Sequence, residues 1–416
     1  MDIAGLGRQG DGMARAEGRS LAIPFALPGE RVRVEGEPPR MTAVLRSSRE
    51  RATPPCRHFG RCGGCRLQHM DRDAILRWKR DRVATALRRE GLGAVDVAQT
   101  LGCQPHSRRR VALSVARRGD EIALGFRARG SHEIVDMVEC HVATPAIVAA
   151  LPDLRACAAT LLSGARPAVV SVTDCREGLD VAFALPRPMG EGVRSALVRV
   201  AARGGFARLS VDGEIVLERA HPTVAFATTA IVPPPGAFLQ AVASIEDAMA
   251  ARVLAHLAGA GRVADLFAGC GTFALRLAPR ADVHAVEGDA AALEALRDGA
   301  RDGGQGFGTV TTERRDLFAE PLVPSELRRF DGLVLDPPRA GAADQATHLA
   351  ASGIARIAYV SCNPETLARD LATLTAGGYR VREVTPFDQF LWSPHTEVVA
   401  LLERLAPKTP RRSIFR

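Results

Sequence analysis

The C-terminal part of the chain predicts an α/β fold, a parallel β-sheet with helices on both faces. Five short strand-like runs alternate there with segments long enough for helices, which is the pattern of successive βαβ units. The run Val232-Pro233-Pro234-Pro235-Gly236 separates this series from the residues before it. The expected strands are residues 263–267, 283–287, 310–313, 333–336 and 354–360.

The first 50 residues predict a small β-module. They are rich in glycine and hold two strand-like runs, 21–25 and 31–35, joined by the turn Pro28-Gly29. So many turns in so short a segment indicate a compact, OB-like barrel over residues 1–50. Residues 37–55 are interpreted as a linker because proline punctuates both of their ends.

Residues 51–231 predict a central domain of mixed α+β type. It begins with a cysteine-rich segment and continues with an amphipathic helix at about 71–90. After residue 100, β-like runs alternate with turns. The third domain is then expected at residues 232–416, which gives a chain of 416 residues ample length for three cores.

Positive charge is concentrated in the first third of the chain. Residues 1–150 carry 26 Lys and Arg against 17 Asp and Glu, an excess of nine, whereas the remaining residues carry 29 against 30. A basic front joined to a nearly neutral rear predicts that the front binds a polyanion such as RNA. Candidate phosphate contacts are Arg108, Arg109, Arg110, Arg127 and Arg129.

The composition also indicates the cellular compartment in which the protein is expected. No run of 18 apolar residues is free of charge, and the N-terminus lacks a basic segment followed by an apolar one. We therefore expect no membrane association and a cytoplasmic protein. In that compartment the nine cysteines should be reduced thiols that bind metal or act in catalysis, not disulfides.

Three cysteines form a C-x5-C-x2-C cluster, Cys56, Cys62 and Cys65, with glycines between them. Thiolates brought this close need a fourth ligand, for which Cys103, Cys140, His58 and His69 are candidates. Zinc accepts three cysteines and a histidine, whereas an iron–sulfur cluster prefers four cysteines. The spacing alone leaves both metals open.

The first strand of the predicted sheet runs into a glycine turn, Ala268-Gly269-Cys270-Gly271. Acidic residues stand at or after the next three strands: Glu287, Asp316 and Asp336. The turn does not match G-x-G-x-x-G, so the spacing favours S-adenosylmethionine over a dinucleotide.

The last predicted strand leads into Ser361-Cys362-Asn363-Pro364. Pro364 suits the first turn of a helix, which places Cys362 between the end of a strand and the start of a helix. The partly positive end of that helix should lower the pKa of the thiol and favour the nucleophilic thiolate.

Over nearly its whole length the chain resembles the RNA 5-methyluridine methyltransferases. The likeness begins with the N-terminal segment, similar to a TRAM domain, and the C-x5-C-x2-C cluster. It continues through Glu139-Cys140-His141-Val142, Phe238-Leu239-Gln240, Asp265-Leu266-Phe267, Glu287, Asp336-Pro337-Pro338-Arg339, Ser361-Cys362-Asn363-Pro364 and Glu397.

The resemblance implies a Rossmann-like S-adenosylmethionine-dependent methyltransferase domain preceded by a TRAM barrel and an iron–sulfur domain. It implies Cys362 as the nucleophile and Glu397 as the base. The implied ligands of a [4Fe-4S] cluster are Cys56, Cys62, Cys65 and Cys140, with Cys103 set aside. The implied cofactor contacts are Gln240, Phe267, Thr272, Glu287, Asp316 and Asp336.

Together these features predict an enzyme that methylates carbon 5 of a uridine in 23S rRNA, acting as a monomer. The barrel and the cluster favour ribosomal RNA, and the same reaction on tRNA is the alternative. Two other classes agree less well with the sequence. A non-catalytic ribosome-binding protein would not need both Cys362 and Glu397, and an iron–sulfur redox enzyme would not need the methyltransferase-like half.

Overall fold

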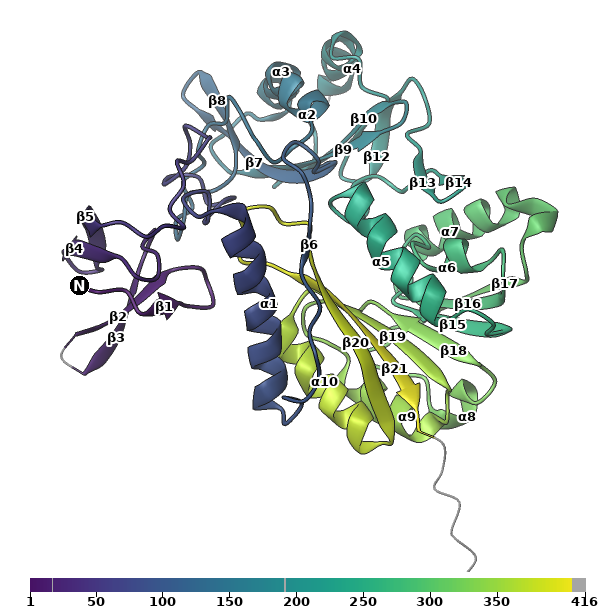
Figure 1. Ribbon diagram of the computed structural model, residues 1–416. Helices are drawn as coiled ribbons and strands as arrows, with labels where there is room; N and C mark the ends of the chain where they lie inside the picture. Colours follow the sequence, from purple (N-terminus) through teal and green to yellow (C-terminus); the bar gives the residue numbers. More distant parts are fainter. Residues whose placement is uncertain (17, 191, 406–416) are drawn as a thin grey trace, which may run out of the picture.

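A computed structural model describes residues 1–16, 18–190 and 192–405. Its largest element is an eight-stranded sheet in the order β17-β16-β15-β18-β19-β21-β20-β6 (Figure 1). The strands are β6 (Leu101–Gly102), β15 (Arg262–Leu266), β16 (Asp282–Glu287), β17 (Val310–Arg314), β18 (Gly332–Leu335), β19 (Arg356–Ser361), β20 (Tyr379–Asp388) and β21 (Glu397–Arg404).

The five predicted strands are present and run parallel, within two residues of their expected bounds. The expectation of a wholly parallel sheet was wrong, because β21 lies antiparallel between β19 and β20. A short loop, residues 389–396, joins β20 to β21, and strands linked this closely form a hairpin and cannot be parallel.

Helices cover both faces of this sheet, as predicted. Alternate strand residues point to opposite faces, so Val263 packs in the core beneath α5 and α6 while Ala264 packs in the core on the other face. Helices α1, α9 and α10 contribute to that second core. The helices are α1 (Arg72–Arg89), α5 (Ala243–His256), α6 (Ala274–Leu277), α7 (Ala290–Asp302), α8 (Pro324–Leu327), α9 (Ala343–Ser352) and α10 (Pro364–Ala376).

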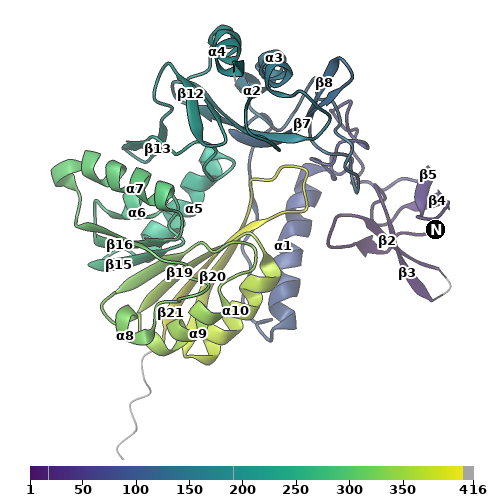
Figure 2. The ribbon, with the colours of Figure 1, turned by 180° about the vertical axis from the view of Figure 1, so that it is seen from behind.

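The central region forms a second sheet in the order β12-β11-β10-β9-β7-β8 (Figure 2). Its pairs are antiparallel except β10 and β11, which helix α4 connects. Its elements are β7 (Arg110–Arg118), β8 (Glu121–Gly125), α2 (Pro145–Ala149), α3 (Leu151–Leu161), β9 (Ala168–Cys175), β10 (Gly178–Ala184), α4 (Val193–Arg203), β11 (Arg208–Val211) and β12 (Glu214–Glu218). The hairpin β13 (Val224–Phe226) and β14 (Thr229–Ile231) follows.

The N-terminal module is small and made of strands. A three-stranded sheet, β1 (Gly5–Leu6), β2 (Gly12–Ala16) and β3 (Arg19–Ile23), and a two-stranded sheet, β4 (Arg31–Glu35) and β5 (Arg40–Arg46), enclose a core around Ile23 and Val32. Strand β5 lies inside the segment interpreted as a linker, because its pairing with β4 was not visible in the sequence. The identification of the module as a TRAM barrel stays a prediction.

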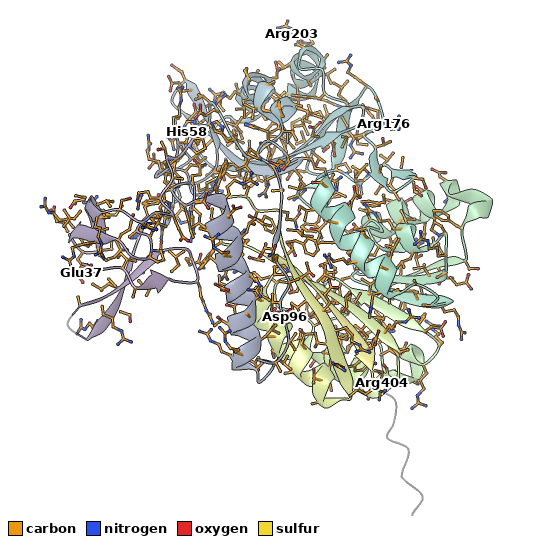
Figure 3. The ribbon with its side chains drawn as sticks, viewed as in Figure 1. Glu37, His58, Asp96, Arg176, Arg203 and Arg404 are labelled. Carbon is orange, nitrogen blue, oxygen red and sulfur yellow. The ribbon has the colours of Figure 1, made fainter. Side chains whose placement is uncertain are left out.

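Part of the front half is built into the C-terminal sheet. Helix α1, predicted at about 71–90, packs against α10 and β20, and β6 pairs with β20 at its edge. In Figure 3, Asp96 marks the segment that returns from α1 along this edge. Among the described residues no helix is both long and apolar enough to cross a membrane.

Candidate active site

A cavity of about 450 Å³ opens at the carboxyl ends of the parallel strands. Strand β15 lies between β16 and β18. After β15 the chain forms β16 and β17 on one side of it, and then crosses to form β18 and β19 on the other side. Open α/β sheets bind ligands at such a switch point because the loops diverge there. The cavity therefore lies where the fold favours a ligand.

Most of the residues predicted for catalysis or cofactor binding line this one cavity. The structure brings together Gln240, Phe267, Thr272, Glu287, Asp336, Cys362 and Glu397. Asp316 does not line it; its carboxylate instead accepts the backbone N–H of Phe318 at 2.9 Å. Phe318 in turn packs on Phe267, with ring centroids 5.5 Å apart, so Asp316 is connected to the cavity only through these two rings.

The glycine turn after β15 forms one wall. Gly271 has φ of 96°, and a Cβ there would approach the Leu296 side chain to 2.9 Å, so only glycine fits. The Glu287 carboxylate accepts backbone N–H groups from Gly269 at 3.0 Å and Gly288 at 2.7 Å. These bonds fix the acid at the end of β16 while it still lines the cavity.

Cys362 and Glu397 are neighbours across the sheet. Strands β19 and β21 pair Ser361 with Val398, and the next pair in this antiparallel register is Cys362 opposite Glu397. Helix α10 begins at Pro364, and the Asn363 side chain caps it by accepting the N–H of Glu365 at 3.2 Å. The predicted position of Cys362 between strand and helix is thus confirmed.

The predicted lowering of the Cys362 pKa is wrong for the free protein. Burial, together with the negative charges of Glu397 and Asp336, raises the pKa of the thiol to about 11. These effects outweigh the helix terminus, since Cys362 stands before the helix N-cap, Asn363.

Two buried carboxyl groups face the same cavity. Burial, and then the charge of Asp336, raises the pKa of Glu397 to about 8. Burial raises the pKa of Asp336 to about 7, and a hydrogen bond from Gln240 Nε2 to Asp336 Oδ2 at 3.0 Å opposes this shift. A cavity that holds these acids and Glu287 favours a cationic ligand.

Sequence reasoning assigned no role to two residues beside the cavity. Gln389, 1% exposed, bonds to both Gln240 and Glu397. Asp265 is fully buried, and its Oδ2 accepts the N–H of Ala274 at 2.8 Å, which ties β15 to the start of α6. Asp265 belongs to a motif of the family resemblance, but nothing in the sequence distinguishes Gln389 from any other polar residue.

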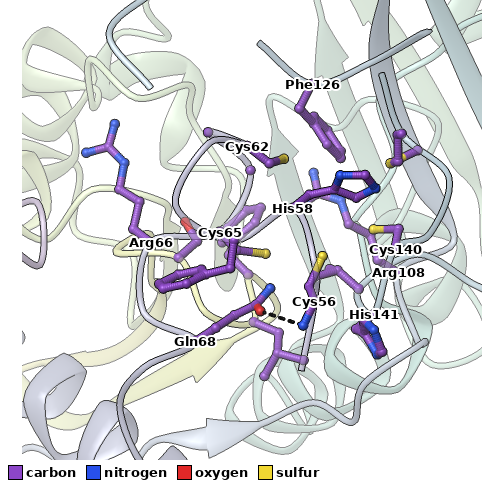
Figure 4. A pocket seen from close by; sticks show the side chains of 18 of the residues that line it. Cys56, His58, Cys62, Cys65, Arg66, Gln68, Arg108, Phe126, Cys140 and His141 are labelled. Atoms are coloured by element: carbon purple, nitrogen blue, oxygen red, sulfur yellow. Dashed lines mark hydrogen bonds between the residues drawn. The ribbon is translucent and has the colours of Figure 1, made fainter. Parts of the chain in front are cut away.

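A second cavity, of about 280 Å³, holds the predicted metal ligands. The side chains of Cys56, Cys62 and Cys65, on the segment between β5 and α1, and of Cys140, on the segment between β8 and α2, point into it (Figure 4). Burial, and then the other cysteines, raises the pKa of Cys65 to about 12 when no cation is present. Such a set of thiols is suited to a positively charged metal centre, which favours thiolates.

The other candidate ligands are distributed differently. Cys103 and His69 do not line the cysteine cavity, whereas His58 does, together with His141, which was not among the candidates. Within the described residues no group of three or more His, Cys, Asp or Glu side chains is close enough to hold a single metal ion. A four-iron cluster spans more space than one ion, so its ligands stand farther apart, and the cluster stays a prediction.

Two of the candidate RNA-contacting arginines are bound to carboxylates. Arg109 Nη2 lies 2.8 Å from Glu246 Oε2, and Arg129 Nη2 lies 2.6 Å from Asp11. Arg108 lines the cysteine cavity. The charges of Arg109 and Arg129 are thus engaged by carboxylates of the protein. Phosphate contact by Arg108, Arg110 and Arg127 stays a prediction.

Comparison with known proteins agrees with the geometry. The family model described as tRNA (Uracil-5-)-methyltransferase matches residues 309–405. A 23S rRNA (uracil(1939)-C(5))-methyltransferase of Chromohalobacter salexigens is 35% identical, over all of this chain and 91% of that protein. The chain belongs to the RNA uracil-C5 methyltransferase family. A Mesorhizobium japonicum protein described as an uncharacterized RNA methyltransferase is 51% identical, over 98% of this chain and 97% of that protein.

The fold of this family member also matches a solved structure over almost its full length. The tRNA (uracil-54, C5)-methyltransferase of Pyrococcus abyssi, in complex with S-adenosyl-L-homocysteine, superposes with a TM-score of 0.73. The match covers 96% of this chain and 98% of that chain at 24% identity, so it concerns the fold.

Proposed function

We propose that this protein transfers a methyl group from S-adenosylmethionine to carbon 5 of a uridine in 23S rRNA through a covalent Cys362–uracil adduct. The observation that carries the proposal is the meeting of Cys362 and Glu397 in one cavity with the acids at the strand ends. A thiol and a carboxyl group opposite each other on adjacent strands fit a nucleophile and a base that act on the same ring.

The reaction requires the thiolate because carbon 5 of uracil is a weak nucleophile. The Cys362 thiolate adds to carbon 6, and the electron pair of the 5,6 double bond becomes an enolate with its charge at carbon 5. S-adenosylmethionine supplies the methyl group as an electrophilic sulfonium cation. Carbon 5 forms its bond to the methyl group as the bond from methyl to sulfur breaks, which leaves S-adenosylhomocysteine.

Glu397 completes the cycle. Its carboxylate removes the proton from carbon 5, the double bond re-forms, and the bond between carbon 6 and Cys362 sulfur breaks to return the thiolate. Burial keeps water away from the carboxylate, and its raised pKa makes it a stronger base than an exposed glutamate. A target uridine must leave its stack to enter this cavity.

We assign the acidic side of the cavity to the binding of S-adenosylmethionine. Gln240, Phe267, Thr272, Glu287 and Asp336 would contact it, with Asp316 supporting the rim beside Phe318. A cation bound among these acids would lower the pKa of Cys362 and oppose the shift caused by burial. The thiol would therefore become reactive only when the cofactor is present.

Cys56, Cys62, Cys65 and Cys140 are proposed as ligands of a [4Fe-4S] cluster. Four thiols around one cavity form the ligand set of such a cluster. Zinc also binds four cysteines, but no three of the described His, Cys, Asp or Glu side chains are close enough together to hold a single ion, which favours the cluster. An iron assay on anaerobically purified protein tests this assignment. Stoichiometric zinc without iron would contradict it.

Ribosomal RNA is the proposed substrate, supported by the full-length likeness to the Chromohalobacter enzyme. The tRNA alternative is supported by the name of the matched family model and by the Pyrococcus structure. The test is methyl transfer to a 23S rRNA fragment and to unmodified tRNA, with 5-methyluridine mapped in each. Transfer to tRNA alone would overturn the ribosomal assignment while preserving the chemistry.

A further inference from the structure

Gln389 connects several residues by hydrogen bonds, but no step of the proposed mechanism uses it. It is the first residue after β20, it is 1% exposed, and it belongs to the loop that leads to Glu397. In Figures 1 and 2 this loop, yellow, leaves the sheet and passes beside the upper end of α1. A buried amide must satisfy its donors and its acceptor inside the protein, so each of its bonds is informative.

The orientation of the Gln389 amide is fixed by the backbone. Its Oε1 accepts the N–H of Ala241 at 2.8 Å, and a backbone N–H can only donate. Its Nε2 must therefore point the other way. There it donates to Gln240 Oε1 at 2.6 Å and to Glu397 Oε1 at 3.1 Å. A flipped amide would place an oxygen against two acceptors.

The bonds form a chain across the cavity. Gln240 uses its oxygen for Gln389 and its Nε2 for Asp336, so the order is Glu397, Gln389, Gln240 and Asp336. Gln389 holds Oε1 of Glu397, and among the described residues no side chain bonds to Oε2, which is therefore the oxygen left for a ligand. The direction of the carboxylate is thus determined by its neighbour.

We propose that Gln389 is a positioning residue for proton removal, holding the Glu397 carboxylate toward carbon 5 of the methylated uracil and linking it to the cofactor wall. The inference rests on the proposed roles of Cys362 and Glu397. Addition of Cys362 to the ring does not use Gln389. Removal of the proton does, because a misdirected carboxylate cannot reach it.

The test is Gln389→Met, a change of similar size that removes both donors. Adduct formation should slow about threefold or less, whereas adduct breakdown should slow about 30-fold, as expected when a reacting group is misplaced by about 1 Å. The covalent protein–RNA species should accumulate on denaturing gels. Gln345→Met is the matched control, because Gln345 is also 1% exposed and bonds to the backbone of Leu322, away from the cavity.

A pH profile separates positioning from a merely structural role. The bond from Gln389 favours the charged form of Glu397, so its loss should move the midpoint of adduct breakdown to higher pH. Gln389→Glu serves as a second variant if the first folds poorly. The substituted carboxylate still accepts the N–H of Ala241, but it places an acceptor oxygen next to Glu397. The pH midpoint of adduct breakdown should therefore also move to higher pH.

Parallel measurement of Glu397→Gln keeps two failures distinct. If Glu397→Gln turns over normally with no trapped adduct, the proposed base is wrong. If Glu397→Gln traps the adduct while Gln389→Met and Gln389→Glu break it down like the unchanged protein, the base stands and the inference about Gln389 is overturned. Equal slowing of adduct formation and breakdown would also overturn it, since that pattern indicates general damage.

A second, independent observation concerns the same loop. Phe390, Leu391, Ser393, Pro394 and His395 line the cysteine cavity. The carbonyl of Trp392 accepts two backbone N–H groups from the segment that follows Cys65, Arg66 at 2.8 Å and Leu67 at 3.0 Å. The loop before Glu397 is therefore also a wall of the proposed cluster site.

We infer that the contents of the cysteine cavity control the order of residues 389–396, and through them the placement of Glu397. Hydrogen exchange of these residues, compared between iron-loaded protein and protein freed of iron by chelation, tests this. Exchange in the loop should rise at least fivefold without iron, while the affinity for S-adenosylhomocysteine changes less than about threefold. Equal exchange in the two forms would overturn the inference alone. Protein that never binds iron would overturn the cluster as well.

Discussion

The cofactor cavity is lined largely by residues at the ends of regular strands, whereas the cysteine cavity is lined mostly by residues on loops. Glu287, Asp336 and Cys362 each follow or end a strand, so pairing between strands sets their spacing. Cys56, Cys62, Cys65 and Cys140 lie outside helices and strands, and their loops are held by turns and by contacts with each other. The first site is positioned by the sheet, and the second depends more on what it binds.

This difference predicts opposite responses to substitution. Changes in the cofactor cavity should abolish chemistry and leave the fold intact, because the sheet supports itself. Changes in the cysteine cavity should weaken the local fold first. Residues 389–396 connect the two cavities, so the distinction is sharper away from that loop.

The largest effect is expected for Cys362→Ala. Methyl transfer should fall by more than about 10⁴-fold, because no other group can add to carbon 6. Binding of S-adenosylhomocysteine and the thermal midpoint should change little, which calorimetry and melting measure. Cys157→Ala is the control, since Cys157 is fully buried in the core of the central sheet. Activity in Cys362→Ala comparable with the control would remove Cys362 from the mechanism.

Glu397→Gln is expected to slow turnover by about 10²- to 10³-fold and to trap the methylated adduct, since the carbon 5 proton then stays in place. Gels of denatured protein with labelled RNA detect the trapped species. Absence of that species, with turnover near normal, would assign proton removal to another group.

The same change should stabilise the fold at alkaline pH. Burial raises the Glu397 pKa from 4.5 to about 8, so the folded protein binds this proton more tightly than the unfolded chain. The free energy of unfolding therefore decreases as the pH rises from about 4.5 to about 8, because the folded state must give up this more tightly held proton. A glutamine at this position does not titrate, so the variant does not lose this stability. At pH 8.5 the free energy of unfolding should increase by roughly 2–4 kcal/mol, and near pH 5 by far less. Denaturant unfolding at both pH values checks this, and equal gains would contradict it.

The sequence predicted the cofactor half more completely than the front half, for physical reasons. Strands β15, β16, β18 and β19 are local runs of mostly buried residues, and β17, which is only partly buried, has the valine and threonine residues typical of strands. The acids at the ends of these strands could therefore be placed without knowing the pairing. The insertion of β21 depends on long-range pairing, and the bonds of Gln389 join residues 149 and 8 positions away. The Cys362 pKa was mispredicted because burial and neighbouring carboxyl groups appear only in the folded protein.

A smaller effect on activity is expected for Cys65→Ser. The variant should lose bound iron and melt at lower temperature, with a loss of roughly 2–5 kcal/mol, as when a structural crosslink is removed. Cofactor binding should persist, because the sheet that forms the cofactor cavity is not disturbed. Iron content and melting are the measurements, and Cys103→Ala, which lies outside the cysteine cavity, is the control. Full iron content in Cys65→Ser would exclude Cys65 as a ligand.

The smallest effect on chemistry is expected from the N-terminal module, because none of its residues lines either cavity. Arg15, Arg19 and Arg33 are exposed on its strands, and none has an ion-pair partner within the described residues. Each phosphate that is no longer neutralised should reduce the slope of log affinity against log salt by roughly 0.7–0.9. Changing all three to Gln should therefore raise KM for a ribosomal RNA fragment about 10-fold at low salt and flatten its salt dependence.

The control for this triple change is a variant of equal charge. Arg199, Arg203 and Arg380 are equally exposed on other elements, and their change to Gln provides it. Since the module supplies affinity and not chemistry, kcat should stay within about twofold in both variants. An equal rise in KM in both would mean that total charge, not the module, binds RNA. A collapse of kcat in the first variant alone would mean that the module helps to assemble the active site, and the separation of affinity from chemistry would then be wrong.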